Sequence, residues 1–209
     1  MSSFLITGSE GQLGRCFQAV AQEFPEHQLI FAKKTKVNIT LPGTFEKAYQ
    51  LQPFDGIINC AAYTAVDKAE DEKEKAALIN QLAVANIAQA CGLLDCWLVH
   101  ISTDHLFSGN QEFVEEDFET SPVNNYGKTK SLGEQQVLEN CKNALVVRTN
   151  FFGWGSEYRQ SFSDFIINKL RSDEKVDLFS DVFFTPILVE ELSKNTHQLI
   201  AEGLSGVFN

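Results

Sequence analysis

Short apolar runs alternate along the chain with segments whose apolar residues recur every three or four positions. The runs predict strands in "FLITG" (4–8), "LIFAK" (29–33), "GIINCAA" (56–62), "CWLVHIST" (96–103) and "ALVVRTN" (144–150). The periodic segments predict helices over 12–24, 44–52, 67–92 and 126–141. Because the runs are continuously apolar, helices are expected on both faces of the sheet. This order predicts an α/β fold with a doubly wound parallel sheet.

Beyond residue 150 the pattern is less regular. It predicts a helix over 161–172, a strand in "KVDLF" (175–179), a helix over 189–203 and a final strand in "GVFN" (206–209). A strand in the last four residues leads us to expect that a further segment follows Asn209. We expect residues 1–150 to form one domain and residues 151–209 to form an incomplete second part, interleaved with the last strands.

Composition and charge narrow the class of protein. The 209 residues are 44% hydrophobic and 22% charged, which is ordinary for a soluble globular protein. The net charge of −11 argues against nucleic-acid binding, which needs a basic face. No signal peptide or membrane span is expected, so a cytoplasmic protein is predicted. The five cysteines include no C-x-x-C pair, and we expect reduced thiols and no metal site.

A glycine-rich turn follows the first predicted strand. The sequence "FLITGSEGQLGR" places Gly8, Gly11 and Gly14 before a helical segment, with Gln12 and Leu13 between them. Glycines there allow a tight turn and let backbone N–H groups approach a pyrophosphate at the helix N-terminus. In this strand–turn–helix context the pattern predicts a Rossmann-type dinucleotide-binding domain.

The ends of the second and third strands bear on the choice of cofactor. An acidic residue about 20 positions after the glycines is typical of NAD binding, but the sequence there is "FAKKTK". Lys33 and Lys34 suit the 2′-phosphate of NADP(H), although lysines also serve simply to solvate a loop. NADP(H) is therefore preferred, with NAD(H) as the alternative. Small residues at Cys60, Ala61 and Ala62 leave room for a nucleotide, and buried packing favours them equally.

The segment "NNYGKTKSLGE" (124–134) places Tyr126 and Lys130 four residues apart, on one face of a predicted helix. An ammonium near a phenol favours the phenolate and lowers its pKa towards a range useful for proton transfer. The same lysine can hold a ribose hydroxyl. Asn124 and Asn125 suit either helix capping or ligand contact.

Polar residues at the end of the fourth predicted strand bear on the role of Tyr126. The sequence "HISTDHLF" places Thr103 and Asp104 at the carboxyl edge of the predicted sheet, where parallel sheets bind their ligands. A hydroxyl at this edge can hold a substrate oxygen beside the proton of the tyrosine. Thr103 also suits a strand end through its β propensity alone.

Five stretches together resemble the extended short-chain dehydrogenases/reductases, and among them the dTDP-4-dehydrorhamnose reductase family of nucleotide-sugar reductases. They are "GSEGQLGR", "NCAAYTAVDKAE", "ISTDHLF", "SPVNNYGKTKSLGE" and "VVRTNFFG", within residues 4–153. The resemblance implies NAD(P)H-dependent reduction of a 4-keto sugar on a nucleotide. Tyr126 would protonate the carbonyl oxygen. Lys130 would lower the pKa of Tyr126 and bind the nicotinamide ribose, and Thr103 would hydrogen-bond the sugar oxygen.

The resemblance also implies further contacts and shows where this chain departs from the family. Asp104 and Phe151 would lie beside the sugar. Asn38 and Ile39 would lie near the adenine, with Asn38 in place of the acidic residue of the family. His105 replaces the tyrosine of the usual "STDY", and "FFGWG" is not the common form, which leaves the sugar open. Most of the substrate-binding part of the family is expected beyond Asn209.

Other functions stay open on the same scaffold. A dehydratase is expected to carry an Asp-Glu pair after the threonine, but His105 follows Asp104, so reduction is favoured over dehydration; epimerisation is harder to exclude. A non-catalytic dinucleotide-binding subunit, similar to the β subunit of methionine adenosyltransferase, shares the fold. Thr103, Tyr126 and Lys130 together favour an enzyme. The predicted partner is a nucleotide-sugar substrate, without nucleic acid or membrane, and a homodimer is the candidate assembly.

Overall fold

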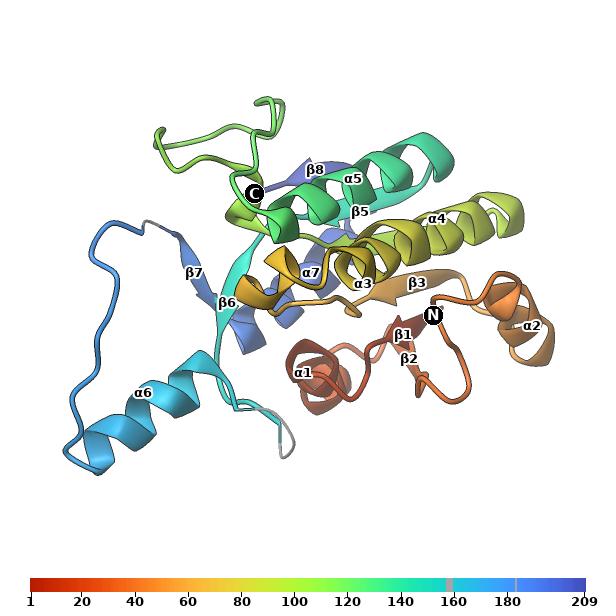
Figure 1. The fold of residues 1–209 in the computed structure, drawn as a ribbon. Helices are drawn as coiled ribbons and strands as arrows, with labels where there is room; N and C mark the ends of the chain where they lie inside the picture. The colour runs from red at the N-terminus through yellow and green to blue at the C-terminus, as the bar shows by residue number, and fades with distance from the viewer. Residues whose placement is uncertain (157–159, 183) are drawn as a thin grey trace.

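The computed structural model describes residues 1–156, 160–182 and 184–209, and its centre is a six-stranded parallel sheet. The strand order is β2-β1-β3-β4-β5-β8 (Figure 1). The strands are β1 Ser2–Thr7, β2 His27–Phe31, β3 Gly56–Asn59, β4 Trp97–Ile101, β5 Ala144–Val147 and β8 Gly206–Phe208. The predicted doubly wound α/β fold is confirmed. Each of the six strands overlaps a predicted strand, the five apolar runs up to residue 150 and the final "GVFN".

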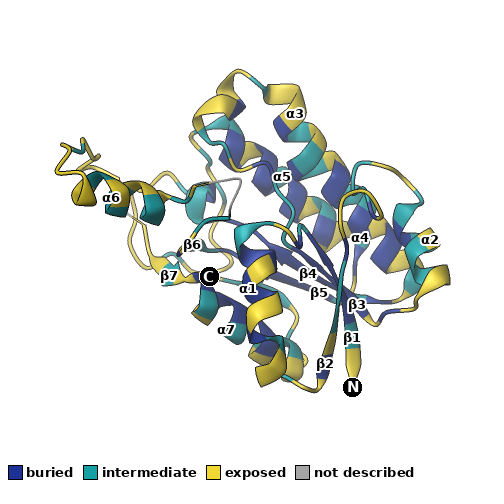
Figure 2. Cartoon of the chain, turned by 90° about the horizontal axis from the view of Figure 1, so that it is seen from below, coloured by how far each residue is buried: buried dark blue, intermediate teal, exposed yellow. Residues whose placement is uncertain are grey.

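Helices cover both faces of the sheet (Figure 2). Helices α1 (Gln12–Val20) and α7 (Val189–Ala201) pack together on one face. Helices α2 (Thr44–Leu51), α4 (Ala83–Leu94) and α5 (Asn125–Asn140) cover the other. A short 3₁₀ turn, η1 (Ala21–Glu23), continues α1.

Successive strand residues enter two separate hydrophobic clusters. Leu5 and Ile57 pack under α2, α4 and α5, whereas Phe4, Ile6 and Ile58 pack under α1 and α7. Successive side chains of a strand point to opposite faces, so a strand covered on both sides must be apolar at every position. Each such fully buried side chain contributes about 1.5–3 kcal/mol of transfer free energy. This explains the unbroken apolar runs in the sequence.

The segment predicted as one helix over 67–92 is interrupted. It comprises the 3₁₀ turn η2 (Asp67–Glu70), α3 (Lys73–Ala77), a π-helical turn η3 (Leu78–Leu82) and then α4. By length and mean hydropathy the helical stretch Lys73–Leu94 could cross a membrane, contrary to the expectation from the sequence. Part of this apolar character belongs to core residues of α4, namely Val84, Ile87, Ala88, Ala90 and Cys91, whereas Leu78, Leu82 and Leu93 are exposed.

The described residues between 150 and 188 form a part of the chain whose helix lies away from the six-stranded sheet (Figure 1). It contains a two-stranded parallel sheet of β6 (Asn150–Phe152) and β7 (Pro186–Leu188), and the amphipathic helix α6 (Phe162–Arg171). The predicted strand over 175–179 is wrong, because these residues lie in an irregular and largely exposed stretch that pairs with no strand in the described part of the chain. After β7 the chain returns through α7, and β8 pairs with β5.

A buried ion pair fixes α5 to the end of β5. Arg148 Nη2 donates to Glu134 Oε2 at 2.9 Å, and its Nε lies 3.1 and 3.2 Å from the two carboxylate oxygens. Only 7% of the Arg148 side chain and 4% of the Glu134 side chain are exposed. Arg148 Nη1 also donates to the backbone carbonyl of Glu116 at 3.1 Å. Both charges therefore have partners in an environment that excludes water.

Replacing Arg148 by Met should lower the free energy of unfolding by about 3–5 kcal/mol, because it leaves the Glu134 carboxylate buried without its cation. Urea denaturation followed by circular dichroism would measure this. The matched control is Lys75→Met, which removes the exposed ion pair with Glu72 and should change stability little. Equal effects of the two substitutions would contradict the importance assigned to the buried pair.

Candidate active site

The candidate site lies at the carboxyl edge of the sheet, between β1 and β3. These two strands are neighbours, and the strand order reverses between them, which is where open α/β sheets bind ligands. Thr7 of β1 pairs in register with Asn59 of β3. The glycine turn that begins at Gly8 and the segment 60–62 therefore leave the sheet side by side, as expected for two parts of one site.

The glycine turn depends on close backbone contacts. Gly8 has a φ of +63°, and a Cβ atom there would lie 2.7 Å from the backbone nitrogen of Ala61 and 2.8 Å from the carbonyl carbon of Cys60. At Gly14 a Cβ atom would lie 2.6 Å from Ser9 Cα. The backbone N–H of Gly11 donates to the Gly8 carbonyl at 2.9 Å. Glycine is thus needed for the turn to reach β3 and α1.

The start of α1 fits a phosphate group. The helix begins at Gln12, and its N-cap residue Gly11 supplies no side chain to accept from the N–H groups of the first turn. Gln12 Nε2 is buried without a hydrogen-bond partner among the described residues. Unpaired donors at a helix N-terminus favour an anion. Leu13, which lies in the same turn, instead points into the core.

A hollow of about 370 Å³ adjoins the glycine turn and contains only one of the two predicted lysines. Its lining includes Ser9 and Arg15 from the glycine turn and α1, and Lys33 from the end of β2. Lys33 Nζ lies 3.6 Å from a Glu10 carboxylate oxygen, so the hollow has cationic and anionic sides. Lys34 is exposed and outside this lining. Sequence reasoning missed Arg15, although its position directly after Gly14 was a usable signal.

The two residues predicted near the adenine have partners within the protein. Asn38 Oδ1 accepts from the backbone N–H and the hydroxyl of Thr40, at 3.2 and 2.9 Å. The carbonyl of Ile39 accepts from Asn86 Nδ2 of α4 at 3.4 Å, and its side chain packs on the cluster under α4. These contacts explain both residues as parts of a loop held to α4. A role towards a nucleotide stays a prediction.

The beginning of α5 places Tyr126. Asn124 is the N-cap, and its side chain accepts from the backbone N–H of Gly127 at 2.7 Å. Asn125 Nδ2 donates to the carbonyl of Ala69 at 2.8 Å. Asn124 therefore caps the helix, and Asn125 holds its start to Ala69. A ligand contact of either asparagine stays a prediction.

Tyr126 and Thr103 meet at the end of β4. Both residues are buried. Burial raises the pKa of Tyr126 to about 12; the neighbouring Thr103 hydroxyl opposes this rise and the charge of Asp104 adds to it. The ring of His105 lies edge-on to the Tyr126 ring, with centroids 5.5 Å apart. A phenol and a threonine hydroxyl are thus brought together as predicted.

The carboxylate of Asp104 connects this pair to the region after residue 150. Asn150 Nδ2 lies 3.2 and 3.3 Å from the two Asp104 oxygens. Burial raises the pKa of Asp104. Phe151, the next residue of β6, packs on the hydrophobic cluster under α1 and α7. The structure therefore places Asp104 beside Thr103, whereas the contacts of Phe151 are those of a core residue.

Lys130 lies on the same helix face as Tyr126, but its contacts differ from the expectation. Its Nζ donates to the backbone carbonyl of Ile101 at 2.7 Å and lies 3.4 Å from His100 Nε2. Burial lowers the pKa of Lys130 to about 8, opposed by the charge of Glu134. The expectation that Lys130 lowers the pKa of Tyr126 is wrong for this structure. The desolvation of the phenol dominates its pKa.

Three polar residues near this site were missed from the sequence. Asn59 and His100 lie buried in β3 and β4, and each contacts the other. Asn80, in the π-helical turn, accepts from the backbone N–H of Tyr63 at 2.8 Å and donates to Thr129 at 3.2 Å. The sequence signal for Asn59 and His100 was a polar residue within or at the end of an apolar strand, as in "GIIN" and "WLVHI".

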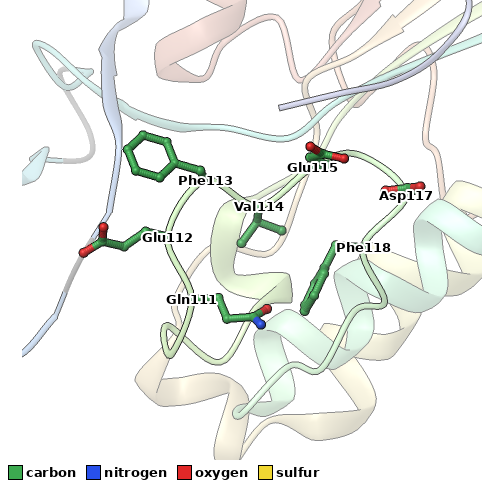
Figure 3. A pocket seen from close by; sticks show the side chains of 7 residues that line it. All are labelled: Gln111, Glu112, Phe113, Val114, Glu115, Asp117 and Phe118. Carbon is green, nitrogen blue, oxygen red and sulfur yellow. The ribbon is translucent and has the colours of Figure 1, made fainter.

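A second hollow, of about 310 Å³, lies in the loop between β4 and α5 (Figure 3). Seven residues from Gln111 to Phe118 line it, and three of them, Glu112, Glu115 and Asp117, are acidic. Carboxylates repel an anionic nucleotide. The glycine turn and the end of β4 are therefore the better candidate for the site.

Comparison with known proteins identifies the family. A sequence model described as "RmlD substrate binding domain" matches residues 1–208. The chain belongs to this family. RmlD-family relatives include the dTDP-4-dehydrorhamnose reductase of Mycolicibacterium smegmatis, 36% identical over 207 residues, which cover 96% of this chain and 61% of that protein. The predicted resemblance to this reductase family is confirmed.

Other RmlD-family relatives agree in sequence and in structure. The dTDP-4-dehydrorhamnose reductase of Salmonella typhimurium is 36% identical over 164 residues, which cover 78% of this chain and 54% of that protein. The chain thus spans between half and two thirds of the length of these curated relatives. The crystal structure of dTDP-4-dehydrorhamnose reductase from Bacillus anthracis in complex with NADP superposes with a TM-score of 0.92 at 32% identity, covering 99% of this chain and 73% of that one.

The lowered pKa of Lys130 predicts how stability depends on pH. Between its folded value of about 8 and its ordinary value of 10.5, the unfolded chain binds the proton more readily than the folded one. The free energy of unfolding should therefore rise with pH across this window, on the order of 3 kcal/mol more in the wild type than in Lys130→Met. Urea denaturation at pH 7.5, 9 and 10.5 measures this difference.

The matched control for this prediction is Lys128→Met, since Lys128 is exposed on the same helix. That variant should keep the pH dependence of the wild type. Parallel pH profiles for the wild type and Lys130→Met would show that Lys130 is not destabilised as an ammonium.

Proposed function

We propose that the chain carries the cofactor-binding part and the proton donor of an NADPH-dependent reductase acting on a nucleotide-linked 4-keto sugar. The observation that carries this proposal is the meeting of Tyr126 and Thr103 at the sheet edge that also holds the glycine turn. The names of the RmlD-family relatives, dTDP-4-dehydrorhamnose reductases, support the same reaction.

The cofactor would lie across the glycine turn. The uncapped start of α1 suits the pyrophosphate of the cofactor. Gly8 packs closely on the backbone of Ala61, where a Cβ atom would not fit. Arg15 and Lys33 would hold the 2′-phosphate of NADPH, with Ser9 beside them in the same hollow. The NADP complex of the Bacillus anthracis relative supports NADPH, and NAD(H) is the alternative. Bound NADPH would supply a hydride to the carbonyl carbon.

The residues of the chain would supply the proton and the positioning. With a pKa raised to about 12, Tyr126 stays protonated at neutral pH and can donate to the oxygen as it gains charge. Thr103 would hydrogen-bond the same oxygen and fix its direction. The buried Lys130 would bind the nicotinamide ribose. Asp104 and Phe151 would lie on the sugar side.

The assignment extends to the organisation of the chain. We assign residues 1–150 to the cofactor domain, completed by α7 and β8, and the stretch 151–188 to the substrate side. Asn38 and Ile39 would contact the adenine from their loop. A cytoplasmic protein without a nucleic-acid partner fits the charge of −11 and the five free cysteines. We keep a homodimer without a membrane partner as the proposed assembly.

Tyr126→Phe tests the assignment of the proton donor. It should lower the rate of NADPH oxidation with dTDP-4-dehydrorhamnose by about 100-fold or more, because the phenolic proton is lost, while NADPH affinity stays within about twofold. Absorbance of NADPH and its fluorescence on binding give the two measurements. Tyr49→Phe, on α2 and away from the sheet edge, is the control. Both measurements use the full-length protein; full-length wild type that binds NADPH without turnover would favour a non-catalytic dinucleotide-binding role.

Lys33→Glu tests the site proposed for the 2′-phosphate. The substitution replaces an attraction by a repulsion, so NADPH affinity should fall about tenfold or more while NADH affinity stays unchanged. Isothermal titration calorimetry with both cofactors measures the two affinities. Lys36→Glu, with the same charge change at an exposed position of the same loop, is the matched control. A similar loss of NADPH affinity in both variants would show that the loss comes from the change in net charge and not from a contact of Lys33.

A further inference from the structure

A chain of buried hydrogen bonds runs beneath the candidate site from β1 to α5. Thr7 Oγ1 donates to Asn59 Oδ1 at 2.6 Å, and Asn59 Nδ2 lies 3.0 Å from His100 Nδ1. His100 Nε2 lies 3.4 Å from Lys130 Nζ, which donates to the Ile101 carbonyl at 2.7 Å. Thr7, Asn59, His100 and Lys130 are each at most 2% exposed. The four side chains are therefore removed from bulk solvent.

The orientation of the Asn59 amide decides where His100 carries its proton. Asn59 Oδ1 accepts from the backbone N–H of Ala61 at 3.2 Å as well as from Thr7, and a backbone N–H can only donate. The amide NH₂ group must then face His100 Nδ1, which has to accept. In a neutral imidazole the proton is consequently on Nε2, the nitrogen that faces Lys130.

An N–H group facing Lys130 has a chemical consequence. An ammonium has three donors and no acceptor, so it cannot accept from His100 Nε2–H, whereas a neutral amine can accept through its lone pair. We propose that His100, fixed as its Nε2–H tautomer by Asn59, is a positioning residue that holds the side chain of Lys130 and favours its neutral amine. Its link to catalysis rests on the proposed reductase function, but the tautomer itself does not.

The charged groups around these residues agree with this arrangement. Lys130 is faced by His100 from β4, by the Cys60 thiol after β3, and by Glu134 of its own helix, whose carboxylate is already paired with Arg148. Burial lowers the pKa of His100 well below its usual value, so the imidazole is neutral. Burial raises the pKa of Cys60, which leaves that thiol uncharged at neutral pH. Neither neighbour supplies a charge that would hold an ammonium in place.

A lysine that ionises near neutral pH can accept and return a proton during turnover, which a permanently charged lysine cannot. In the proposed reductase, His100 would therefore determine the pH at which Lys130 changes its charge. A variant that offers Lys130 an acceptor in place of the His100 donor should move that ionisation to higher pH. Two single substitutions, Asn59→Asp and His100→Gln, would offer Lys130 an acceptor; the first adds a charge and the second does not.

Asn59→Asp replaces the amide donor by a carboxylate, which can only accept, so His100 should move its proton to Nδ1 and offer Nε2 as an acceptor. His100→Gln carries no charge, and its amide can turn its oxygen towards Lys130. Both variants should raise the pKa of Lys130 by about one pH unit or more. Thr7→Val is the control, because the N–H of Ala61 still fixes the Asn59 amide; it should leave the tautomer and the pKa of Lys130 unchanged.

Nuclear magnetic resonance of the 209-residue chain tests the inference without any turnover. Long-range ¹H–¹⁵N correlation reports which imidazole nitrogen is protonated, and the Cε signal of labelled Lys130, assigned with Lys130→Met, reports its titration. Wild-type His100 should carry its proton on Nε2 between pH 6 and 8, and Asn59→Asp should reverse this. A wild-type proton on Nδ1, a doubly protonated ring, or a Lys130 titration at its ordinary pH would overturn the proposal.

The wild-type spectra alone decide the tautomer, so the test stands even where a variant fails to fold. Failure of the reductase proposal would appear separately, as NADPH binding without turnover by the full-length protein. The two hypotheses are therefore distinguishable.

Discussion

The burial of Lys130 is the constraint on which the arrangement of the site depends. An ammonium removed from water costs several kcal/mol unless partners replace its hydration. The protein offers one strong acceptor, the Ile101 carbonyl at 2.7 Å, and a histidine at 3.4 Å. Since the carbonyl belongs to β4 and the lysine to α5, this contact sets the height of the helix over the sheet. Tyr126, one turn earlier, is placed at the strand end by the same contact.

Several other interactions hold the elements that meet at Lys130. The Arg148–Glu134 pair ties α5 to β5, and Asn124 fixes the first turn of the helix. Asn80 joins the loop after β3 to Thr129, the neighbour of Lys130, and it does so from a π-helical turn that interrupts the long helical segment. The ion pair and Asn80 fasten α5 to two different parts of the sheet edge, and Asn124 fixes the conformation of the first turn of α5. The position of the Tyr126 hydroxyl therefore depends on contacts from several parts of the domain.

Local patterns in the sequence predicted most elements, because burial on both faces of a strand and one face of a helix is recorded in consecutive residues. They also predicted the glycine turn. The strand expected over 175–179 was wrong, since an apolar pattern cannot show that a partner strand is absent. The buried polar chain was missed because Thr7, Asn59 and His100 are separated by 52 and 41 positions. Spacing placed Tyr126 and Lys130 on one face, but it carried no information on desolvation, which reversed the expected direction of the tyrosine pKa.

Desolvation acts in opposite directions on the two groups and thereby decides which one holds the proton. In water a lysine and a tyrosine ionise at nearly the same pH. Here burial raises the pKa of Tyr126 to about 12 and lowers that of Lys130 to about 8. Between these values the stable form is a neutral phenol beside a neutral amine, because neither charge is solvated. The proton is thus kept on the group nearest Thr103, where a substrate oxygen would need it, and any charge created on that oxygen would be met by a donor already in place.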